Sequence, residues 1–245
     1  MLERLLRFRL AQTWHLRGYA LGDQPGNDTT AGSFFMSNII PGESSGFVLF
    51  YTLGSPNGSV IKRAPSDDGL TWHATGVALN GSADPNDTQF DLGGQSVLKL
   101  NDGRYRMYYR SCPKRASDKE IPKYQVFSAI SSDGVTFAKE EGTRISNRTY
   151  DPSSPLKLAG HGSYIAVDGG FTGIFSGSKV ESTGPSDLMF VSSTDGITWS
   201  NPKTRYRGWH DPSIKRVGKH FIMYASYLES GFAQYWGRFP IVHLP

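Results

Sequence analysis

SDDGLTW at residues 66–72, SDGVTF at 132–137 and STDGITW at 193–199 are three copies of one phrase. Their shared core is Asp-Gly followed by an aliphatic residue, Thr and an aromatic residue, with a Ser ahead of the Asp. Self-similarity at long, regular intervals is the signature of an array of like structural units. The phrase is therefore expected to repeat because a structural unit repeats, and a structural role is preferred for its residues over a catalytic one.

A second set of residues recurs between these copies. Asp91, Asp151 and Asp211 lie 60 residues apart in both steps (151 − 91 and 211 − 151), and the last two each begin an Asp-Pro-Ser tripeptide. At this period the 245 residues hold about four units. The repeat predicts one array-like domain.

Composition agrees with a β-rich fold. Aromatic residues make up 13% of the chain and charged residues 20%, with 28 Gly and 14 Pro. This is a turn-rich composition and excludes a coiled coil or a disordered chain. The net charge is +4, but Lys and Arg are scattered without a basic run. A solvated surface is therefore expected, and no nucleic-acid partner.

Cysteine content and hydropathy narrow the class further. Cys112 is the only cysteine, which excludes an intrachain disulfide and a cysteine zinc cluster. No apolar run is long enough to cross a bilayer, so no membrane partner is expected. Residues 1–10 interrupt their apolar run with Arg and make a poor secretory signal. We expect a soluble monomer, either cytoplasmic or secreted by another route, and the sequence leaves the localisation unknown.

Each unit has the order of elements of one propeller blade. In the second unit, alternating residues at 96–100 predict a strand and Asn-Asp-Gly at 101–103 a tight type I′ turn. Further strands are predicted at 105–109, at 124–130 and from 135 onward, the last after the Asp-Gly turn. Four antiparallel strands joined by tight turns form a blade.

The predicted fold class is therefore an all-β β-propeller of four to five blades of four antiparallel strands. The blades are expected at roughly 30–88, 89–147, 148–203 and 204–245 within a single domain. Residues 1–20 could close the last blade, which removes two exposed sheet edges. The alternative is a shortened version of a longer propeller.

The third unit contains a polar exception to the repeat. Its glycines predict a turn at 160–162 and a second strand at 163–167 that ends at Asp168. The other units carry Tyr109 and Ala225 at that place. A polar residue that breaks a repeat is better evidence of function than one that follows it.

The architecture predicts where chemistry would lie. The first strand of a blade is innermost, so its start and the end of the second strand open at one mouth of the central channel. Paired carboxylates at such a mouth are what glycoside hydrolysis requires, one as acid and one as base or nucleophile. An Asp before Pro-Ser can instead cap a turn. The candidate catalytic residues are Asp91, Asp151, Asp211, Asp168, Glu181 and Glu229, and the candidate substrate-binding residues are Arg110, Trp209, His210 and Tyr227.

The phrases DPS, NDGRYRMYY at 101–109 and SxDG-aliphatic-T-aromatic resemble a known superfamily. They are similar to the arabinanase/levansucrase/invertase superfamily of five-bladed propellers, which includes glycoside hydrolase families 43, 32, 62 and 68. The resemblance covers roughly residues 30–226 and implies hydrolysis of O-glycosidic bonds in poly- or oligosaccharides. It also implies three acids from three inner strands.

The resemblance assigns roles residue by residue. Asp91 matches the family's second Asp, which tunes the site. Asp151 stands where the family has its general-acid Glu, and the chain contains no Glu-Gly-Pro. Asp28 is the nearest candidate for the early Asp. These departures leave two alternatives beside a glycosidase: a non-catalytic propeller that binds glycans, and a protein-interaction propeller. No cofactor is expected, and a bound channel cation such as calcium remains open.

Overall fold

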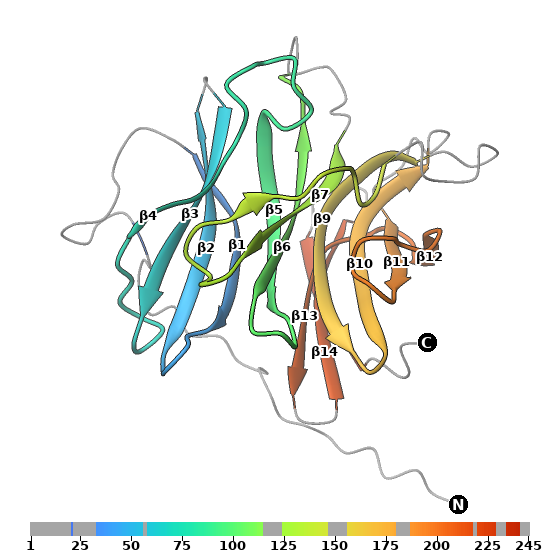
Figure 1. Ribbon diagram of the computed structural model, residues 1–245. Coiled ribbons are helices and arrows are strands. Elements are labelled where there is room, and N and C mark those ends of the chain that lie inside the picture. Colours follow the sequence, from blue (N-terminus) through green and yellow to red (C-terminus); the bar gives the residue numbers. More distant parts are fainter. Residues whose placement is uncertain are drawn as a thin grey trace, which may run out of the picture.

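The computed structural model describes residues 21, 33–55, 58–114, 124–146, 156–179, 187–217, 220–228 and 234–240. Every regular element within these ranges is a β-strand, and the strands form four antiparallel sheets (Figure 1). In each sheet the strands follow one another in chain order, with neighbours paired. Hairpin-connected sheets of this kind are propeller blades, which confirms the predicted all-β propeller.

The bounds of the strands are as follows. The first sheet holds β1 (Ser33–Pro41), β2 (Phe47–Ser55), β3 (Gly58–Ser66) and β4 (Gly76–Asn80). The second holds β5 (Asp91–Lys99), β6 (Tyr105–Cys112), β7 (Gln125–Ser131) and β8 (Ala138–Lys139). The third holds β9 (Leu156–Val167), β10 (Gly170–Lys179), β11 (Asp187–Ser193) and β12 (Lys203–Tyr206). The fourth holds β13 (Trp209–Val217), β14 (His220–Leu228) and β15 (Gln234–Pro240).

The first strand of each sheet faces the shared axis. β5 contacts β1 on one side and β9 on the other, and β9 also contacts β13. In Figure 1 the later strands of the first sheet extend to the left of β1, and those of the third sheet extend to the right of β9. The fourth sheet has three strands within the described ranges. The predicted closure by residues 1–20 lies outside the described residues.

The repeated phrase forms the same turn three times. In the third copy, the Asp195 carboxylate accepts the backbone N–H groups of Ile197 and Thr198 at 2.7 and 2.8 Å. The Ser193 hydroxyl donates to Asp195 at 2.9 Å and accepts the Gly196 N–H at 2.8 Å. The backbone hydrogen bonds lower the pKa of Asp195 to about 2, because they stabilise the charged form. The same bonds recur around Asp68 and Asp133.

The turn also fastens one sheet to the sheet before it. The Tyr108 hydroxyl, on β6, donates to the Gly196 carbonyl at 2.8 Å, and Arg106 donates to the Asp195 carbonyl at 3.1 Å. Trp199, the aromatic residue of this copy, packs edge-on against Tyr108 with ring centres 5.4 Å apart. These contacts join the third copy of the phrase to the preceding blade and agree with the structural role expected for it.

The aromatic residues of the other two copies pack differently from each other. Phe137 meets Phe50 of the first sheet edge-on at 5.8 Å, as Trp199 meets Tyr108. Trp72 packs instead within its own sheet, against Leu49 and Tyr51.

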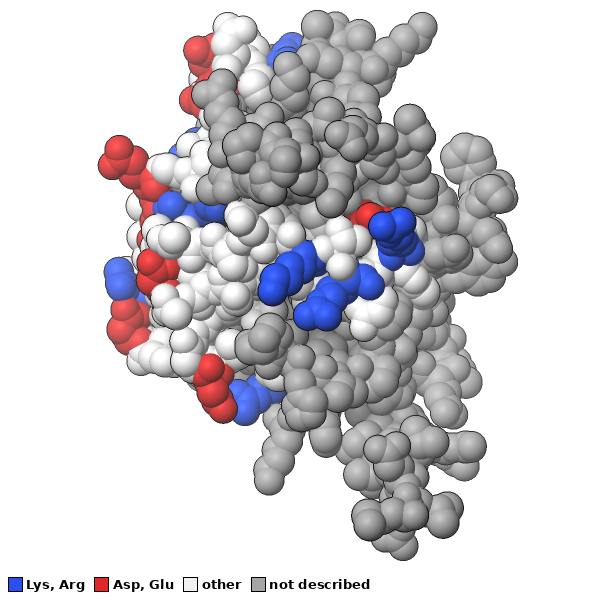
Figure 2. All heavy atoms as spheres, turned by 90° about the vertical axis from the view of Figure 1, so that its right-hand side faces the viewer, with Lys and Arg blue, Asp and Glu red and all other residues white. Residues whose placement is uncertain are grey.

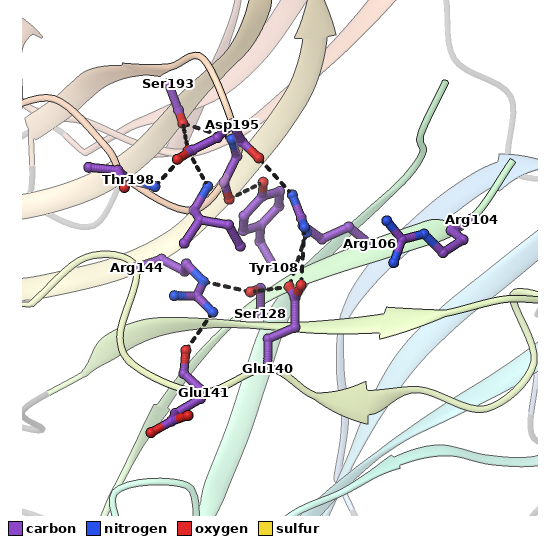
Figure 3. A network of polar contacts seen from close by, with 12 residues as sticks. Arg104, Arg106, Tyr108, Ser128, Glu140, Glu141, Arg144, Ser193, Asp195 and Thr198 are labelled. Atoms are coloured by element: carbon purple, nitrogen blue, oxygen red, sulfur yellow. Dashed lines mark hydrogen bonds and ion pairs between the residues drawn. The ribbon is translucent and has the colours of Figure 1, made fainter. Parts of the chain in front are cut away.

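A polar network stabilises the junction between the second and third sheets (Figure 3). Arg106 forms two bonds to the Glu140 carboxylate, both 3.0 Å long. Ser128 donates to Glu140 at 2.6 Å and accepts from Arg144 at 2.7 Å. Arg106, Ser128 and Arg144 are buried. A buried charge is tolerated only when it is paired and hydrogen-bonded, as Arg106 is here.

The third sheet departs from the sequence prediction. β9 runs without a break from Leu156 to Val167, and the hairpin turn lies at 168–169. Gly162 is in the strand because of packing: a Cβ there would lie 2.9 Å from the Cβ of Phe175. The turn glycines are Gly169 and Gly170, with φ of 83° and 157°. The predicted turn at 160–162 is therefore wrong, and Asp168 does not end a second strand.

The turn contacts can be tested with a pair of glycine variants. Gly196 and Gly103 have similar backbone angles, with φ of 73° and 88°. A Cβ at Gly196 would meet the Tyr108 hydroxyl at 2.7 Å and Arg106 at 2.5 Å, whereas nothing lies within 4 Å at Gly103. We expect Gly103→Ala to lower the free energy of unfolding by about 1–2 kcal/mol. Gly196→Ala should lose a further ~1–3 kcal/mol through overpacking.

Urea unfolding of both variants and the parent measures the difference. Equal losses for Gly196→Ala and Gly103→Ala would show that the contact between turn and neighbouring sheet contributes nothing to stability.

Candidate functional site

A bulge lies in the inner strand of every sheet. The register shifts between Gly93 and Ser96 in β5, and between His210 and Ser213 in β13. β1 and β9 have shifts of their own where they pair with β2 and β10. A bulge bends its strand and changes the direction of the side chains beside it. In β5 the bulge follows the predicted acid Asp91, and in β13 it includes the predicted acid Asp211.

Asp91 is half-buried at the start of β5, and other side chains bond both of its carboxylate oxygens. Ser59, from β3 of the first sheet, donates to Oδ1 at 2.7 Å. Tyr124, just before β7, donates to Oδ2 at 3.2 Å. Burial raises the pKa of Tyr124 to about 12, so its phenol keeps the proton that it donates. Asp91 is thus held in one orientation.

Arg110 lies near the end of β6, opposite Gly93 in the register. Its guanidinium carbon is 4.1 Å from the centre of the Tyr124 ring, a cation–π contact. Its Nε is buried without a hydrogen-bond partner, and no described carboxylate forms an ion pair with it. Arg110 therefore has no ion-pair partner within the described part of the chain.

Gly94 allows three segments to meet at this point. Its φ is +60°, and a Cβ there would lie 3.3 Å from the Cα of His161 and 3.4 Å from Cγ and Cδ of Arg110. Any larger residue would push β9 or Arg110 away. The missing side chain brings His161 of the third sheet next to Arg110 of the second.

His161 was missed by the sequence analysis. Burial lowers its pKa to about 4, and the charge of Arg110 acts in the same direction, while Asp211 opposes them. The imidazole is consequently neutral at pH 7. The sequence signal was the Asp-Gly-Gly at 168–170, which marks a hairpin turn after a long strand and would have placed His161 within that strand.

Asp211 is the one non-glycine residue with positive φ in the described ranges, at 50°. Its N–H donates to the Ser176 hydroxyl of β10 at 2.7 Å, which ties β13 to the third sheet. Its side chain is 52% exposed, and the nearest charged partner is His210 Nε2 at 3.8 Å. A strained backbone costs free energy and is often found at functional sites.

Asp91, Arg110, Tyr124, His161 and Asp211 together are called the mouth cluster below. They are linked in series: Tyr124 bonds Asp91 and lies under Arg110, and His161 interacts electrostatically with both Arg110 and Asp211. Three of the five were predicted from sequence, whereas Tyr124 and His161 were not. The cluster draws on the second, third and fourth sheets.

The remaining predicted site residues fall elsewhere. Asp168 is exposed in the β9–β10 turn, beyond the opposite end of β9 from its start, so its predicted place at the mouth is wrong. Trp209 is half-buried and packs against the core between the third and fourth sheets. Tyr227 is described through its backbone, paired with Trp209. Asp151, Glu181 and Glu229 lie outside the described residues.

A cavity of about 370 Å³ lies at the other end of the channel. The later parts of all four inner strands line it. Several of its polar groups already join strands: Asn38 accepts the Val97 N–H and Ser163 accepts the Ile214 N–H. Glu43, the one acid that lines it among the described residues, is bonded to Lys99 and Tyr105. The cavity and the mouth cluster are therefore separate features.

Metal and surface features add little. No group of three or more His, Cys, Asp and Glu side chains is placed to hold a metal ion among the described residues. A search of the same residues finds no helix long and apolar enough to cross a membrane. On the face shown in Figure 2, some described Lys and Arg side chains lie beside Asp or Glu side chains and others lie among uncharged atoms.

Comparison with known proteins gives the fold. No family model and no curated protein matches the sequence. The structure resembles a thermostable family-43 glycoside hydrolase, with a TM-score of 0.67 and 16% identity over 94% of this chain and 79% of that one. A family 117 glycoside hydrolase from Zobellia galactanivorans gives a TM-score of 0.65 at 13% identity, over 91% and 73% of the two chains.

A third similar structure is the GH32 β-fructofuranosidase of Bombyx mori, with a TM-score of 0.59 and 18% identity over 80% of this chain. The chain spans 42% of the length of that enzyme. The likeness shows that the protein has the propeller fold of these glycoside hydrolases, as the sequence phrases implied.

The His161 environment predicts a pH dependence of stability. The folded protein keeps His161 neutral down to about pH 4, whereas the unfolded chain protonates it below about 6.5. The unfolded state thus binds more protons between these values, and stability falls as pH drops from 6.5 to 4. His161→Gln should flatten this slope by up to about 1.4 kcal/mol per pH unit.

Urea midpoints measured from pH 7 to pH 4 test this. His73→Gln, at an exposed position, is the control and should keep the parent slope. Asp68 and Asp195 have pKa values lowered to about 2, so their titration changes the stability mainly below the measured pH range. An unchanged slope in His161→Gln would contradict the assignment.

Proposed function

We propose that the protein is a glycoside hydrolase that cleaves O-glycosidic bonds of a poly- or oligosaccharide at the mouth cluster. The observation that carries the proposal is the presence of Asp91 and Asp211, from the second and fourth sheets, at the two ends of one linked series that also holds a cation and a neutral imidazole. Two carboxylates at one site can serve as proton donor and as base or nucleophile. The fold shared with glycoside hydrolases of several families supports this function.

The two described acids suit different roles. Asp211 is half-exposed, and no hydrogen bond reaches its carboxylate from the described residues, so it is available to attack the anomeric carbon or to activate water. Asp91 accepts hydrogen bonds at both oxygens and is suited to orienting and polarising the substrate. The proton for the departing sugar oxygen would come from Asp151, Glu181 or Glu229.

Isosteric substitution of the acids tests the proposal. The purified protein is assayed against aryl glycosides of arabinose, fructose, galactose and glucose and against arabinan and fructan. Asp211→Asn should lower kcat by roughly 10²–10⁴-fold, the usual contribution of a general acid or base. Asp91→Asn keeps an acceptor for Ser59 or Tyr124 and should fold while also losing activity.

Asp168→Asn is the matched control, because Asp168 is an exposed Asp outside the mouth cluster. It should keep the parent activity. Full activity in Asp211→Asn, with the unfolding midpoint unchanged, would rule out the assigned role.

A second candidate is a propeller that binds a glycan without cleaving it. The observation that favours it is Asp91, whose two oxygens are already bonded within the fold, as expected of a structural carboxylate. Sugar binding measured by calorimetry with no turnover over days would support this function. A protein-interaction propeller would show no affinity for any sugar.

A further inference from the structure

Arg110 has an unusual setting for a cation. Its guanidinium lies over the Tyr124 ring at 4.1 Å, and its Cγ and Cδ lie close to Gly94. Both contacts fix the side chain without using its N–H groups. Its Nε is buried and unbonded, and within the described ranges no carboxylate pairs with it.

The carboxylate nearest in the series forms no ion pair with Arg110. Tyr124 contacts both residues, because its ring lies under Arg110 and its hydroxyl donates to Asp91. The Asp91 oxygens accept hydrogen bonds from Ser59 and Tyr124. Guanidinium cannot lose its proton in a protein, so the positive charge persists at every pH of interest. A buried donor without a partner is costly, and a ligand that supplies an anionic acceptor removes that cost.

The neighbour on the other side is suited to the same ligand. His161 lies against Arg110 across Gly94 and is neutral at pH 7, so its ring can donate one N–H without adding repulsion toward Arg110. A fixed guanidinium beside an imidazole N–H is a site for a planar or tetrahedral oxyanion.

We propose that Arg110, with His161 beside it, selects a sugar that bears an anionic substituent, a carboxylate as in a uronic acid or a sulfate ester. This inference rests on the proposed function and deepens it by naming the substrate class. Arg110 is a specificity-determining residue in this scheme, because the acids at the mouth would carry out the cleavage of the glycosidic bond.

Calorimetry with matched monosaccharides tests the proposal. D-galacturonate, D-galactose 6-sulfate and D-galactose share one ring and differ at C6, and D-glucuronate, D-glucose 6-sulfate and D-glucose form a second set. In one of the sets a charged sugar should bind at least about tenfold more tightly than its neutral counterpart, since charge-assisted bonds are the stronger class. A preference for the uronate identifies a carboxylate ligand, and a preference for the sulfate identifies a sulfated one.

Substitution of Arg110 sharpens the test. Arg110→Gln should weaken the charged sugar by roughly 10–100-fold and the neutral sugar by less than about twofold. Arg110→Lys should recover part of the loss, because it keeps the charge but not the planar fork. Arg205→Gln is the control, at an exposed position of β12. Equal weakening of charged and neutral sugars by Arg110→Gln would overturn the proposal.

A measurement on the parent protein covers the case in which Arg110→Gln does not fold. The pKa of His161, followed by NMR, should rise from about 4 when D-galacturonate or the sulfated sugar is bound, because a nearby anion favours imidazolium. Arg110 and Asp211 are the other charges that act on this ring. An unchanged His161 pKa at saturation would overturn the proposal.

The outcomes separate this inference from the proposed function. Hydrolysis of neutral glycosides with no preference for charged sugars overturns the inference and leaves the glycosidase intact. Binding of charged sugars without hydrolysis contradicts the proposed glycoside hydrolase function and leaves the proposed selection of anionic sugars by Arg110 intact. Absence of binding to all six sugars overturns the inference.

Discussion

The carboxylate of the repeated Asp-Gly turn is the interaction on which the rest of the structure depends. One oxygen of Asp195 accepts two backbone N–H groups and the Ser193 hydroxyl, which fixes the path of the chain between two strands. The turn then exposes its carbonyl groups to Tyr108 and Arg106 of the preceding sheet. A local turn therefore also sets how neighbouring blades sit against each other.

The angle between blades determines what can gather at the channel mouth. Inner strands from different sheets must come close enough for Arg110, His161 and Asp211 to act on one another. Gly94 permits that approach by having no side chain, and the bulges in β5 and β13 alter the pleat just after Asp91 and at Asp211. The cluster is thus a product of packing between sheets, and the third copy of the repeated turn joins the third sheet to the second.

The mouth cluster combines side chains that hydrogen bonds fix in place with side chains that are available to bind a ligand. Asp91 and Tyr124 bond to each other and to Ser59, so they form a rigid support. Arg110 and Asp211 have no ion-pair or side-chain hydrogen-bond partner of this kind among the described residues, beyond the 3.8 Å approach of His210. Rigid support beside unsatisfied charge is the arrangement that a binding site requires.

The repeated phrases were sufficient to predict the propeller and to place Asp91, Arg110 and Asp211 near one mouth, because strand order and hairpin turns are local properties. The prediction for the third sheet was wrong because glycine has two uses. Gly160 and Gly162 lie in a strand beside Ser176 and Phe175, whereas Gly169 and Gly170 form the turn. From sequence alone both pairs are equally good turn signals, and this error hid His161 and misplaced Asp168.

The sequence by itself determined the β architecture, the turn chemistry and the blade period, since these follow from residues within a few positions of each other. Tertiary structure alone decided which side chains share the mouth, that Arg110 has no ion-pair partner among the described residues, and that burial lowers the pKa of His161. Those properties depend on distances between segments 50 or more residues apart, such as Arg110 and His161. Such distances are set by how the sheets pack.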